Sequence, residues 1–241
     1  MLELKNIYKT FNPGTINEKR ALNGLNLKLN EGDFVTVIGG NGAGKSTMLN
    51  AVAGTWPVDE GQILIDNIDV TKLSEHKRAT YLGRVFQDPM TGTAATMGIE
   101  ENLALAKRRG KSRLLRSGIT KAEREEYKEL LKILGLGLED RLTSKVGLLS
   151  GGQRQALTLL MATLQKPKLL LLDEHTAALD PKTAAKVLEI TDMIVNRDHL
   201  TTLMITHNMK DAIAHGNRLI MMMEGKIILD IQGERKETTD S

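Results

Sequence analysis

Several short segments of the chain either alternate apolar and polar residues or are apolar throughout, and both patterns predict β-strands. These segments are residues 2–7, 25–29, 34–38, 62–66, 82–86, 169–172, 200–206, 219–223 and 227–230. The run at 169–172 consists only of leucine, which is typical of a strand in a parallel sheet with both faces covered. The last two segments flank Glu224 and Gly225, which predict a hairpin turn.

Helical periodicity dominates the middle of the chain, from about residue 99 to residue 164. Thr120 and Glu123 have the spacing of a capping box, which opens a helix. This helix carries its apolar residues on one face: Tyr127, Leu130, Leu131 and Leu134. Further helices are expected at residues 45–53, 181–196 and 209–215, with Asp180 as the N-cap of the second and Pro181 in its first turn.

The order of these elements predicts how the chain is organised. Two separated pieces, residues 1–87 and 166–232, supply an α/β core. A mainly helical segment, residues 88–165, is inserted between them. The polar residues 233–241 are expected to form a loose tail.

Composition narrows the class of protein. Hydrophobic residues make up 41% and charged residues 26%, which is ordinary for a soluble domain, and aromatics are only 3%, so the core must be aliphatic. Cysteine is absent, which excludes disulfides and thiolate metal sites. We expect no secretory signal and no membrane span. If the protein functions at a membrane, other polypeptides must therefore supply the membrane-spanning segments. The net charge of +3 is too small to indicate nucleic acid, and no nucleic-acid partner is expected.

A glycine-rich segment carries the first candidate chemistry. Residues 39–46 read GGNGAGKS and match the P-loop pattern, between a predicted strand and a predicted helix. Glycines allow successive backbone N–H groups to surround a polyanion, and the helix N-terminus adds its dipole. In such a loop Lys45 lies near the β- and γ-phosphates and Ser46 offers a hydroxyl to Mg²⁺. A chance glycine turn before Lys-Ser does not explain this context.

Two carboxylates follow the leucine strand. In a P-loop fold this position places Asp173 beside the Mg²⁺ of the nucleotide. Glu174, one residue further, would face the γ-phosphate and could polarise an attacking water. Alternatively, the two carboxylates could cap a turn or helix after a core strand. The presence of a P-loop in the same chain favours the nucleotide-binding interpretation.

The segment LSGGQ at residues 149–153 indicates the family. In this segment the chain resembles the ABC ATPases, whose signature sequence it is, unaltered. A Ser-Gly-Gly at a helix start can also bind an anion through its amides, its hydroxyl and the helix dipole. The resemblance implies that the segment contacts ATP held by the P-loop of a second copy.

Further landmarks follow in the order of the family. Gln87 is similar to the Q-loop glutamine, and AALD at residues 177–180 resembles the D-loop with its Asp180. His207 matches the switch histidine that contacts the γ-phosphate. Phe11 is the best match to the aromatic residue that stacks on adenine, and Tyr8 is the alternative.

The resemblance covers nearly the whole chain and implies a complete site. It implies an α/β P-loop NTPase core with an N-terminal antiparallel β subdomain and an inserted α-helical subdomain. The implied catalytic residues are Lys45, Glu174 and His207. The implied ATP-binding residues are Phe11, Gly39, Gly40, Asn41, Gly42, Ala43, Gly44, Lys45, Ser46, Thr47 and Gln87. Those acting from the second chain are Ser150, Gly151, Gly152, Gln153 and Asp180, and Mg²⁺ would be held by Ser46, Gln87 and Asp173.

The resemblance also implies partner proteins and a cellular location. A second copy or a homologous ATPase subunit completes the dimer, and integral membrane permease subunits and an extracellular substrate-binding protein complete the transporter. The chain would lie at the cytoplasmic face of the membrane as a peripheral subunit that powers import of a small organic solute such as an amino acid. Lipid or lipoprotein export is an alternative. A soluble non-transport ABC ATPase is another, although such relatives generally carry two cassettes, a coiled-coil insertion or zinc cysteines.

Some features remain open at this stage. His175 stands where the family often has proline, and Ala156 and Met161 stand where arginine is common, which suggests a particular importer-like branch. Residues 88–97 and the inserted helices are candidates for gripping a short cytoplasmic helix of the membrane partner. A basic run is either a solvated helix end or a contact for anionic lipid or partner acids. It consists of Lys107, Arg108, Arg109, Lys111, Arg113 and Arg116.

Overall fold

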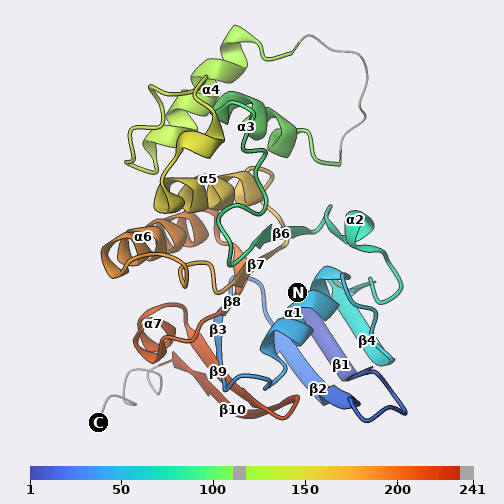
Figure 1. Cartoon of the computed structure of the whole chain (residues 1–241). Helices are drawn as coiled ribbons and strands as arrows, with labels where there is room; N and C mark the ends of the chain where they lie inside the picture. The colour runs from blue at the N-terminus through green and yellow to red at the C-terminus, as the bar shows by residue number, and fades with distance from the viewer. Residues whose placement is uncertain (111–117, 234–241) are drawn as a thin grey trace.

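The computed structural model describes residues 1–110 and 118–233 (Figure 1). The strands are β1 Leu2–Phe11, β2 Lys19–Leu29, β3 Phe34–Ile38, β4 Glu60–Ile65, β5 Ile68–Asp69, β6 Leu82–Val85, β7 Leu169–Asp173, β8 Thr201–Ile205, β9 Arg218–Met223 and β10 Lys226–Gln232. The helices are α1 Lys45–Ala53, α2 Glu75–Arg78, α3 Ile99–Lys107, α4 Lys121–Lys132, α5 Gly151–Thr163, α6 Pro181–Asp198 and α7 Met209–Ala214, with a 3₁₀ turn at Val146–Leu148. Most of the tail and three basic residues, Lys111, Arg113 and Arg116, lie outside the described residues.

A six-stranded sheet forms the centre, in the order β10-β9-β3-β8-β7-β6. All neighbours in it pair in parallel except β9 and β10, which form the predicted antiparallel hairpin. The carboxyl ends of β3, β8, β7 and β6 therefore meet at one edge of the sheet. In open α/β sheets this edge is where ligands bind.

Side chains of this sheet alternate between two cores. In β7, Leu169 and Leu171 pack into a cluster with α1 and the N-terminal strands, whereas Leu170 and Leu172 pack with α3, α5 and α6. All four leucines are fully buried. The leucine run thus forms a strand covered on both faces, as predicted from its lack of polar positions.

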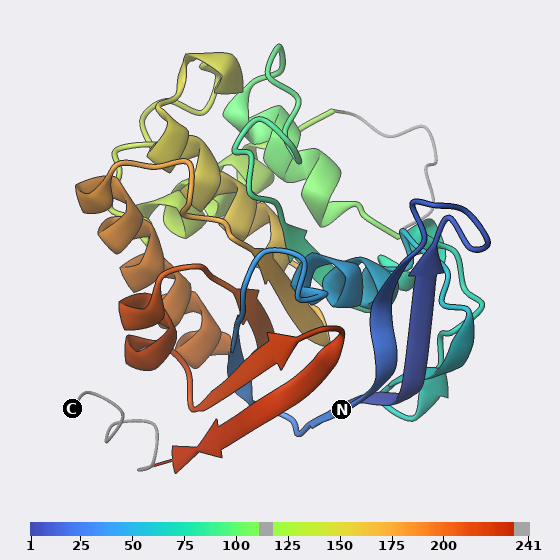
Figure 2. The same cartoon turned by 60° about the horizontal axis from the view of Figure 1, so that its bottom comes forward.

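A second sheet, in the order β2-β1-β4-β5, is antiparallel throughout. It shares its core cluster with the α1 residues Met48, Leu49 and Val52, and Figure 2 shows α1 between the two sheets. This sheet is the N-terminal antiparallel β part of the expected fold. The helix that follows the P-loop is therefore held from two sides.

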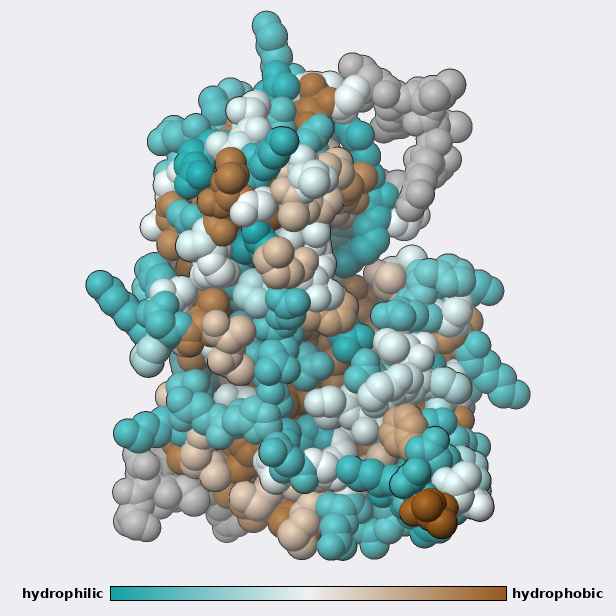
Figure 3. Space-filling view, in the orientation of Figure 1, coloured by the Kyte–Doolittle hydropathy of each residue, from teal (hydrophilic) through white to brown (hydrophobic). Residues whose placement is uncertain are grey.

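The helices of the inserted segment gather at one end of the molecule (Figure 1). Thr120 caps α4 as predicted, since its side chain accepts a hydrogen bond from the Glu123 N–H and the Glu123 carboxylate accepts one from the Thr120 N–H. Tyr127 and Leu131 of α4 are fully buried against α3 and α5. Within the described residues, none of the helices combines the length and the apolar character that crossing a bilayer requires. On the face shown in Figure 3, hydrophobic residues are scattered among hydrophilic ones.

Several predicted boundaries are wrong for a common reason. β1 continues to Phe11 rather than ending at residue 7, and β2 begins at Lys19 rather than at residue 25. Backbone pairing extends this hairpin through residues 8–11 and 19–24, where only the adjacent Ala21 and Leu22 are buried, so no apolar alternation marks it. β5 and α2 were not predicted, because two and four residues are too short for a periodic pattern.

Arg78 is only 2% exposed, and its side chain stabilises the C-terminal end of α1. Its guanidinium donates to the carbonyl oxygens of Ala51 at 2.6 Å and Val52 at 2.9 Å, which are in the last turn of α1. It also donates to the carbonyls of Thr71 and Leu73, both at 2.9 Å. Arg78 therefore satisfies carbonyls that a helix end leaves without partners.

We expect the Arg78→Met substitution to lower the free energy of unfolding by about 3 kcal/mol or more, because buried carbonyls lose their donors. Urea unfolding followed by circular dichroism measures this effect. Lys77→Met, on the exposed side of the same short helix, is the matched control and should change the stability by less than about 0.5 kcal/mol. Equal stability of the two variants would contradict this role of Arg78.

Candidate nucleotide site

The P-loop connects β3 to α1 at the carboxyl edge of the sheet. Gly39, Gly42 and Gly44 have positive φ angles of 148°, 79° and 102°, a region that favours glycine. A Cβ on Gly44 would lie 2.5 Å from the carbonyl oxygen of Ala21, so backbone packing also excludes a side chain there. The conformation of the loop thus requires Gly39, Gly42 and Gly44, whereas Gly40 has open space around the position of a Cβ.

Lys45 begins α1 and is 5% exposed. Its Nζ donates to the carbonyl oxygens of Gly39 at 2.8 Å and Gly40 at 3.2 Å. Ser46 is exposed and Thr47 is partly exposed in the first turn of the helix. This turn carries no acidic residue, so the positive end of the helix dipole is available to an anion.

The neighbouring strands β7 and β8 bring Glu174 and His207 together. Glu174 follows β7 with a φ of 49°, and its backbone N–H donates to the carbonyl of Ile205 at 3.0 Å. Glu174 Oε1 and His207 Nε2 are 2.5 Å apart. The Glu174 side chain is 10% exposed and the His207 side chain 48%. A carboxylate and an imidazole in contact beside a phosphate loop can accept and donate a proton during phosphoryl transfer.

Asp173 is the last residue of β7 and lies near the guanidinium group of Arg84, which the sequence analysis did not predict as a site residue. Arg84 Nη2 of β6 lies 3.8 Å from Asp173 Oδ2. Arg84 also donates to Asn50 Oδ1 at 2.7 Å, which ties β6 to α1. No sequence pattern predicted a role for Arg84. It lies near the Asp173 carboxylate because β6 and β7 are neighbouring strands of the sheet.

The donor set at this edge fits Mg²⁺. The Ser46 hydroxyl, the Asp173 carboxylate and the Gln87 amide all offer oxygen, which this ion prefers. Within residues 1–110 and 118–233, no three His, Cys, Asp or Glu side chains gather as a metal site, so an ion here would rely on these residues and on phosphate oxygens. Burial raises the pKa of Asp173 in spite of the nearby Arg84 and Lys45, and a bound cation would offset that cost.

A cavity of about 460 Å³ adjoins the P-loop. Among the predicted site residues, Gly39, Gly40, Asn41, Gly42, Ala43 and His207 line it. The rest of the lining is mainly apolar and includes Met209, Met221, Met222 and Met223, which the sequence analysis did not predict as site residues. The other predicted site residues do not line this cavity: Phe11, Gly44, Lys45, Ser46, Thr47, Gln87, Asp173, Glu174, Asp180 and the residues 150–153.

Phe11 lies at the end of β1, directly opposite Lys19 of β2. Its ring contacts Trp56 edge to face, with centroids 5.1 Å apart. Tyr8, the alternative adenine residue, instead covers Gly24, where a Cβ would lie 2.9 Å from the Tyr8 hydroxyl.

Lys19 is a residue of this region that the sequence reasoning missed. Its Nζ would lie 3.0 Å from a Cβ built on Gly42, so the ammonium group sits over the P-loop. The only signal for it was its pairing with Phe11, which required knowing the register of β1 and β2.

The Lys19→Met substitution is expected to weaken ATP binding several-fold, about 1 kcal/mol, because an exposed ammonium contributes modestly to holding phosphates. Arg20→Met is the matched control, since the next residue of a strand points to the opposite face. Equilibrium titration with a fluorescent ATP analogue measures both affinities. An unchanged affinity for Lys19→Met would exclude a phosphate contact.

The signature segment lies at the start of α5. Ser150 caps this helix in a capping box with Gln153, and Ser150 and Gly151 are exposed. The tight approach of α6 leaves no room for a side chain at Gly152, where a Cβ would overlap the Thr183 methyl group, and a Cβ on Gly151 would lie 3.2 Å from Leu179, just before α6. Asp180 caps α6 by accepting from the Thr183 N–H at 3.1 Å. The structure thus groups the signature with the D-loop, at the exposed starts of two adjacent helices.

Gln87 is exposed just after β6. The residue before it is linked to the signature helix, because Gln155 Nε2 of α5 donates to the carbonyl oxygen of Phe86 at 2.9 Å. Arg154 of the same helix contacts the Met90 sulfur and donates to the Val146 carbonyl at 3.0 Å. α5 therefore holds the segment that contains Gln87.

Comparison with known families decides the identity. A family model described as "ABC transporter" matches residues 22–177, well over half of the chain. The chain belongs to the ABC transporter family. It is an ATPase of the ABC type, and its fold is that of an ABC ATPase cassette.

Relatives of this ABC cassette include the "Tyrosine transport ATP-binding protein" of Clostridioides difficile, which is 45% identical over 98% of this chain and 94% of the relative. The methionine import protein MetN of Bartonella henselae is 34% identical over 95% of this chain. The chain spans 64% of MetN's length, and it spans 57% of the similarly related spermidine/putrescine import protein PotA of Haemophilus influenzae.

Solved structures with this fold include the dimeric ATP-binding cassette MJ0796 in a post-hydrolysis state bound to ADP and Pi. It is 32% identical, has a TM-score of 0.80, and the match covers 96% of this chain and 98% of that one. A nucleotide-free cassette from an ABC transporter is 28% identical with a TM-score of 0.79, over 98% of this chain and 93% of that one.

His175 follows Glu174 in this ABC cassette and is buried. Its Nε2 lies 3.1 Å from Thr191 Oγ1, and that hydroxyl donates to the Val187 carbonyl at 2.8 Å. Burial lowers the pKa of His175 to about 4, and the nearby His215 acts in the same direction. The imidazole is therefore neutral in the folded protein near pH 7.

Since the pKa of His175 is lower in the folded than in the unfolded chain, the nucleotide-free protein should lose stability as the pH falls from about 6.5 towards 4. The expected loss is on the order of 3 kcal/mol. Urea unfolding at several pH values measures it. His175→Gln should flatten this dependence, whereas His76→Gln, at an exposed position, should not. The same pH slope in both variants would contradict the assignment.

Proposed function

We propose that this ATPase closes on ATP as a dimer, with a second copy or a homologous subunit, and powers transport by separate membrane-spanning permease subunits. The observation that carries the proposal is a site in two halves. His207, which lines the cavity beside the P-loop, is in contact with Glu174, whereas Ser150 of the signature is exposed at the start of another element, α5. A head-to-tail partner can bring the second half to the first.

The proposed chemistry assigns a role to each group. Backbone N–H groups of residues 39–44 and the Lys45 ammonium hold the β- and γ-phosphates, with Ser46 and Thr47 at the helix start. Glu174 accepts a proton from the attacking water, and His207 donates to a γ-phosphate oxygen. Ser46, Gln87 and Asp173 would hold Mg²⁺, which would supply positive charge to the phosphates. Phe11 stacks on the adenine.

Groups from the partner complete the proposed site. Ser150, Gly151, Gly152 and Gln153 face the γ-phosphate of the opposite chain, and Asp180 lies beside them. ATP thereby connects the two chains, and hydrolysis followed by phosphate release removes that connection. Residues 88–165 are proposed to move as one subdomain that carries the signature. The core, which they move against, consists of residues 1–87 and 166–232. The proposal is supported by the hydrogen bond from α5 to the segment after β6.

The proposed direction is import, and the proposed cargo is a small organic solute such as an amino acid. The names of relatives support this choice, since they include a tyrosine transport protein and import proteins for methionine and for spermidine/putrescine. In this arrangement an extracellular substrate-binding protein delivers the solute, and the ATPase works at the cytoplasmic face of the membrane.

Affinity purification of the tagged chain from detergent-solubilised membranes, followed by mass spectrometry, tests this proposal. We expect recovery of a multi-span membrane protein, together with solute-dependent stimulation of ATPase activity in the recovered complex. Recovery with a lipid or lipoprotein export system would replace the importer assignment. Recovery with ribosomes, nucleic acid or soluble proteins only would overturn the transport role and leave the ATPase chemistry standing.

A further inference from the structure

Residues 55–59, which follow α1, contact the end of β1 and the ring of Phe11. Phe11 is partly exposed, and residues 12–18 after it are all exposed. Trp56, the only tryptophan of the chain, is also partly exposed, and its ring meets that of Phe11 at an interplanar angle of 81°. Among the described residues, neither ring belongs to a core cluster. This aromatic pair therefore lies at the surface, beside the P-loop, where it does not serve to fill the core.

Asp59 completes the hydrogen bonding of β1 beyond the last residue that pairs with β4. That pairing ends at Tyr8 and Glu60. The Asp59 N–H donates to the Tyr8 carbonyl at 2.9 Å, and Asp59 Oδ2 accepts from the Thr10 N–H at 2.6 Å. A strand edge otherwise leaves such an N–H without a protein partner. The Asp59 carboxylate thus takes the place of a neighbouring strand, one residue before Phe11.

Lys9 connects the Asp59 carboxylate to the Phe11 ring. Its Nζ donates to Asp59 Oδ1 at 2.9 Å and lies 5.7 Å from the centroid of the ring. The Lys9 side chain is only 13% exposed, so the ammonium is held in this position. A cation near the face of an aromatic ring is attracted by its electrons. Lys9 and Trp56 together fix the orientation of a ring that would otherwise rotate at the end of a strand.

Trp56 is itself attached to the helix that follows the P-loop. Its backbone N–H donates to the Asn50 carbonyl at 3.4 Å, and that of Thr55 donates to the same oxygen at 3.0 Å. Asn50 belongs to α1, which begins with Lys45 and Ser46. The indole that contacts Phe11 and the groups that face the phosphates are therefore held by one helix.

We propose that Trp56 and Asp59 are positioning residues for the base of the nucleotide, because they fix the Phe11 ring in the orientation on which adenine stacks. The inference rests on the stacking of adenine on Phe11 proposed above. A ring that is already fixed loses little rotational freedom when the base stacks on it, so more of the stacking energy contributes to affinity. Since the P-loop and Lys45 hold the phosphates, the effect of both residues should fall on the base.

The test compares ATP with inorganic tripolyphosphate, which has no base, by isothermal titration calorimetry. Trp56→Leu should weaken ATP binding about three- to tenfold, which is the effect of losing one aromatic pair. Its affinity for tripolyphosphate should stay within about twofold of the unchanged chain, and Trp56→Phe, which keeps an edge-to-face contact, should do so for both ligands. Tyr81→Leu is the matched control, because Tyr81 is a partly buried aromatic packed on the core cluster around α1. It should leave the ratio of the two affinities unchanged.

A second pair of variants tests the strand end. Asp59→Ala should raise the KM for ATP about threefold without lowering kcat, because a contact with the base is the same in the ground state and the transition state. Asp59→Asn keeps an acceptor for the Thr10 N–H and should raise the KM less. Glu60→Ala, at the exposed next residue, is the control and should leave the KM unchanged. Steady-state phosphate release measures these constants.

The fluorescence of the unchanged chain gives a direct reading, since Trp56 is its only tryptophan. ATP should change the emission of Trp56, because the base binds at the ring that the indole contacts, and tripolyphosphate should not. An equal change with both ligands would show that Trp56 responds to the phosphates and would contradict the inference.

The possible failures are distinguishable. If Phe11→Leu binds ATP as tightly as the unchanged chain, the proposed stacking itself fails, and the inference fails with it. If Phe11→Leu weakens ATP binding whereas Trp56→Leu and Asp59→Ala do not, only the present inference is overturned. If Trp56→Leu weakens the binding of ATP and of tripolyphosphate equally, Trp56 supports the whole site rather than the base, which equally overturns the inference.

Discussion

The Glu174→Gln variant should hydrolyse ATP about 10²- to 10⁴-fold more slowly than the unchanged protein, because the amide cannot accept the proton of the attacking water. ATP binding should change little, since the P-loop and Lys45 are intact and Gln is nearly isosteric with Glu. A coupled phosphate-release assay measures the rate, and equilibrium titration measures the affinity. Glu189→Gln, at an exposed site on α6, is the control and should retain full activity.

The same variant should also accumulate as an ATP-bound dimer. If hydrolysis opens the dimer, a chain that binds ATP without cleaving it stays closed, and light scattering should then report twice the monomer mass with ATP but not with ADP. Rapid multiple turnover by Glu174→Gln would remove Glu174 as the base. A slow variant that remains monomeric with ATP would retain the base and contradict the dimer.

Two inactive variants should restore each other's activity when mixed. Lys45→Met removes a charge that holds the phosphates, and Ser150→Asp places a negative charge where the signature meets the partner's γ-phosphate. Asp is as good an N-cap as Ser, so α5 should remain intact. Each variant alone is expected to lose at least about 10²-fold in rate, since every composite site is damaged. Mixed dimers contain one site with neither change.

Random pairing makes half of the dimers mixed, so the mixture should recover about a quarter of the unchanged rate if the two sites act independently. Phosphate release at several mixing ratios measures this recovery. Ser150→Asn, which resembles Asp in shape without its charge, should keep far more activity than Ser150→Asp. Absence of recovery at any ratio, with both variants folded and able to dimerise, would place the signature and the P-loop in the same chain's site.

Side-chain contacts connect the signature helix with the other elements of the nucleotide site. α5 begins at the signature, and its side chains Arg154 and Gln155 hold the segment after β6. Arg84 joins that strand to α1 and to Asp173. Movement of the signature would therefore also move the segment that contains Gln87.

Much of this site was determined by the sequence itself, because its features are local. The P-loop conformation follows from glycines at positive φ, the buried strand from its leucines, and the starts of α4, α5 and α6 from capping residues at fixed spacing. Such features depend on residues within a few positions of one another, so one chain segment suffices to predict them. The fold class could be predicted for the same reason.

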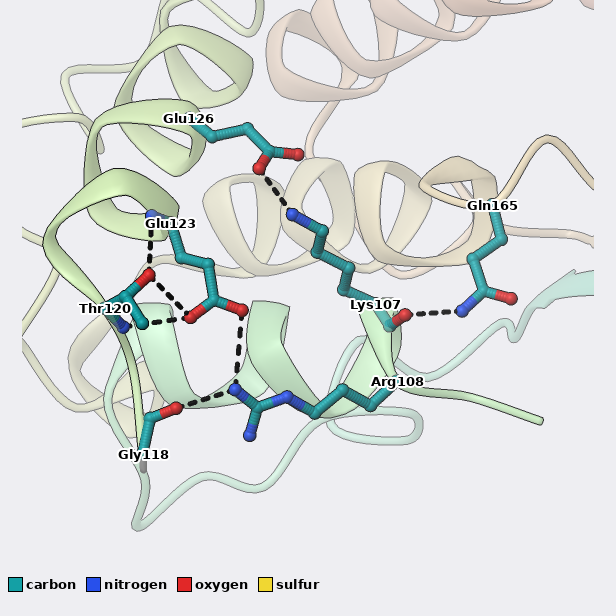
Figure 4. A network of polar contacts seen from close by, with 7 residues as sticks. All are labelled: Lys107, Arg108, Gly118, Thr120, Glu123, Glu126 and Gln165. Atoms are coloured by element: carbon teal, nitrogen blue, oxygen red, sulfur yellow. Dashed lines mark hydrogen bonds and ion pairs between the residues drawn. The ribbon is translucent and has the colours of Figure 1, made fainter. Parts of the chain in front are cut away.

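The tertiary structure alone decided which side chains meet. Glu174 contacts His207 because β7 and β8 are neighbours, and Arg84 reaches Asp173 because β6 pairs with β7. Three consecutive basic residues have the same sequence signal, yet Lys107 and Arg108 pair with glutamates of α4 (Figure 4), whereas Arg109 donates to the Ala162 carbonyl of α5. Pairing between distant segments is fixed by strand order and helix packing, which local patterns do not encode.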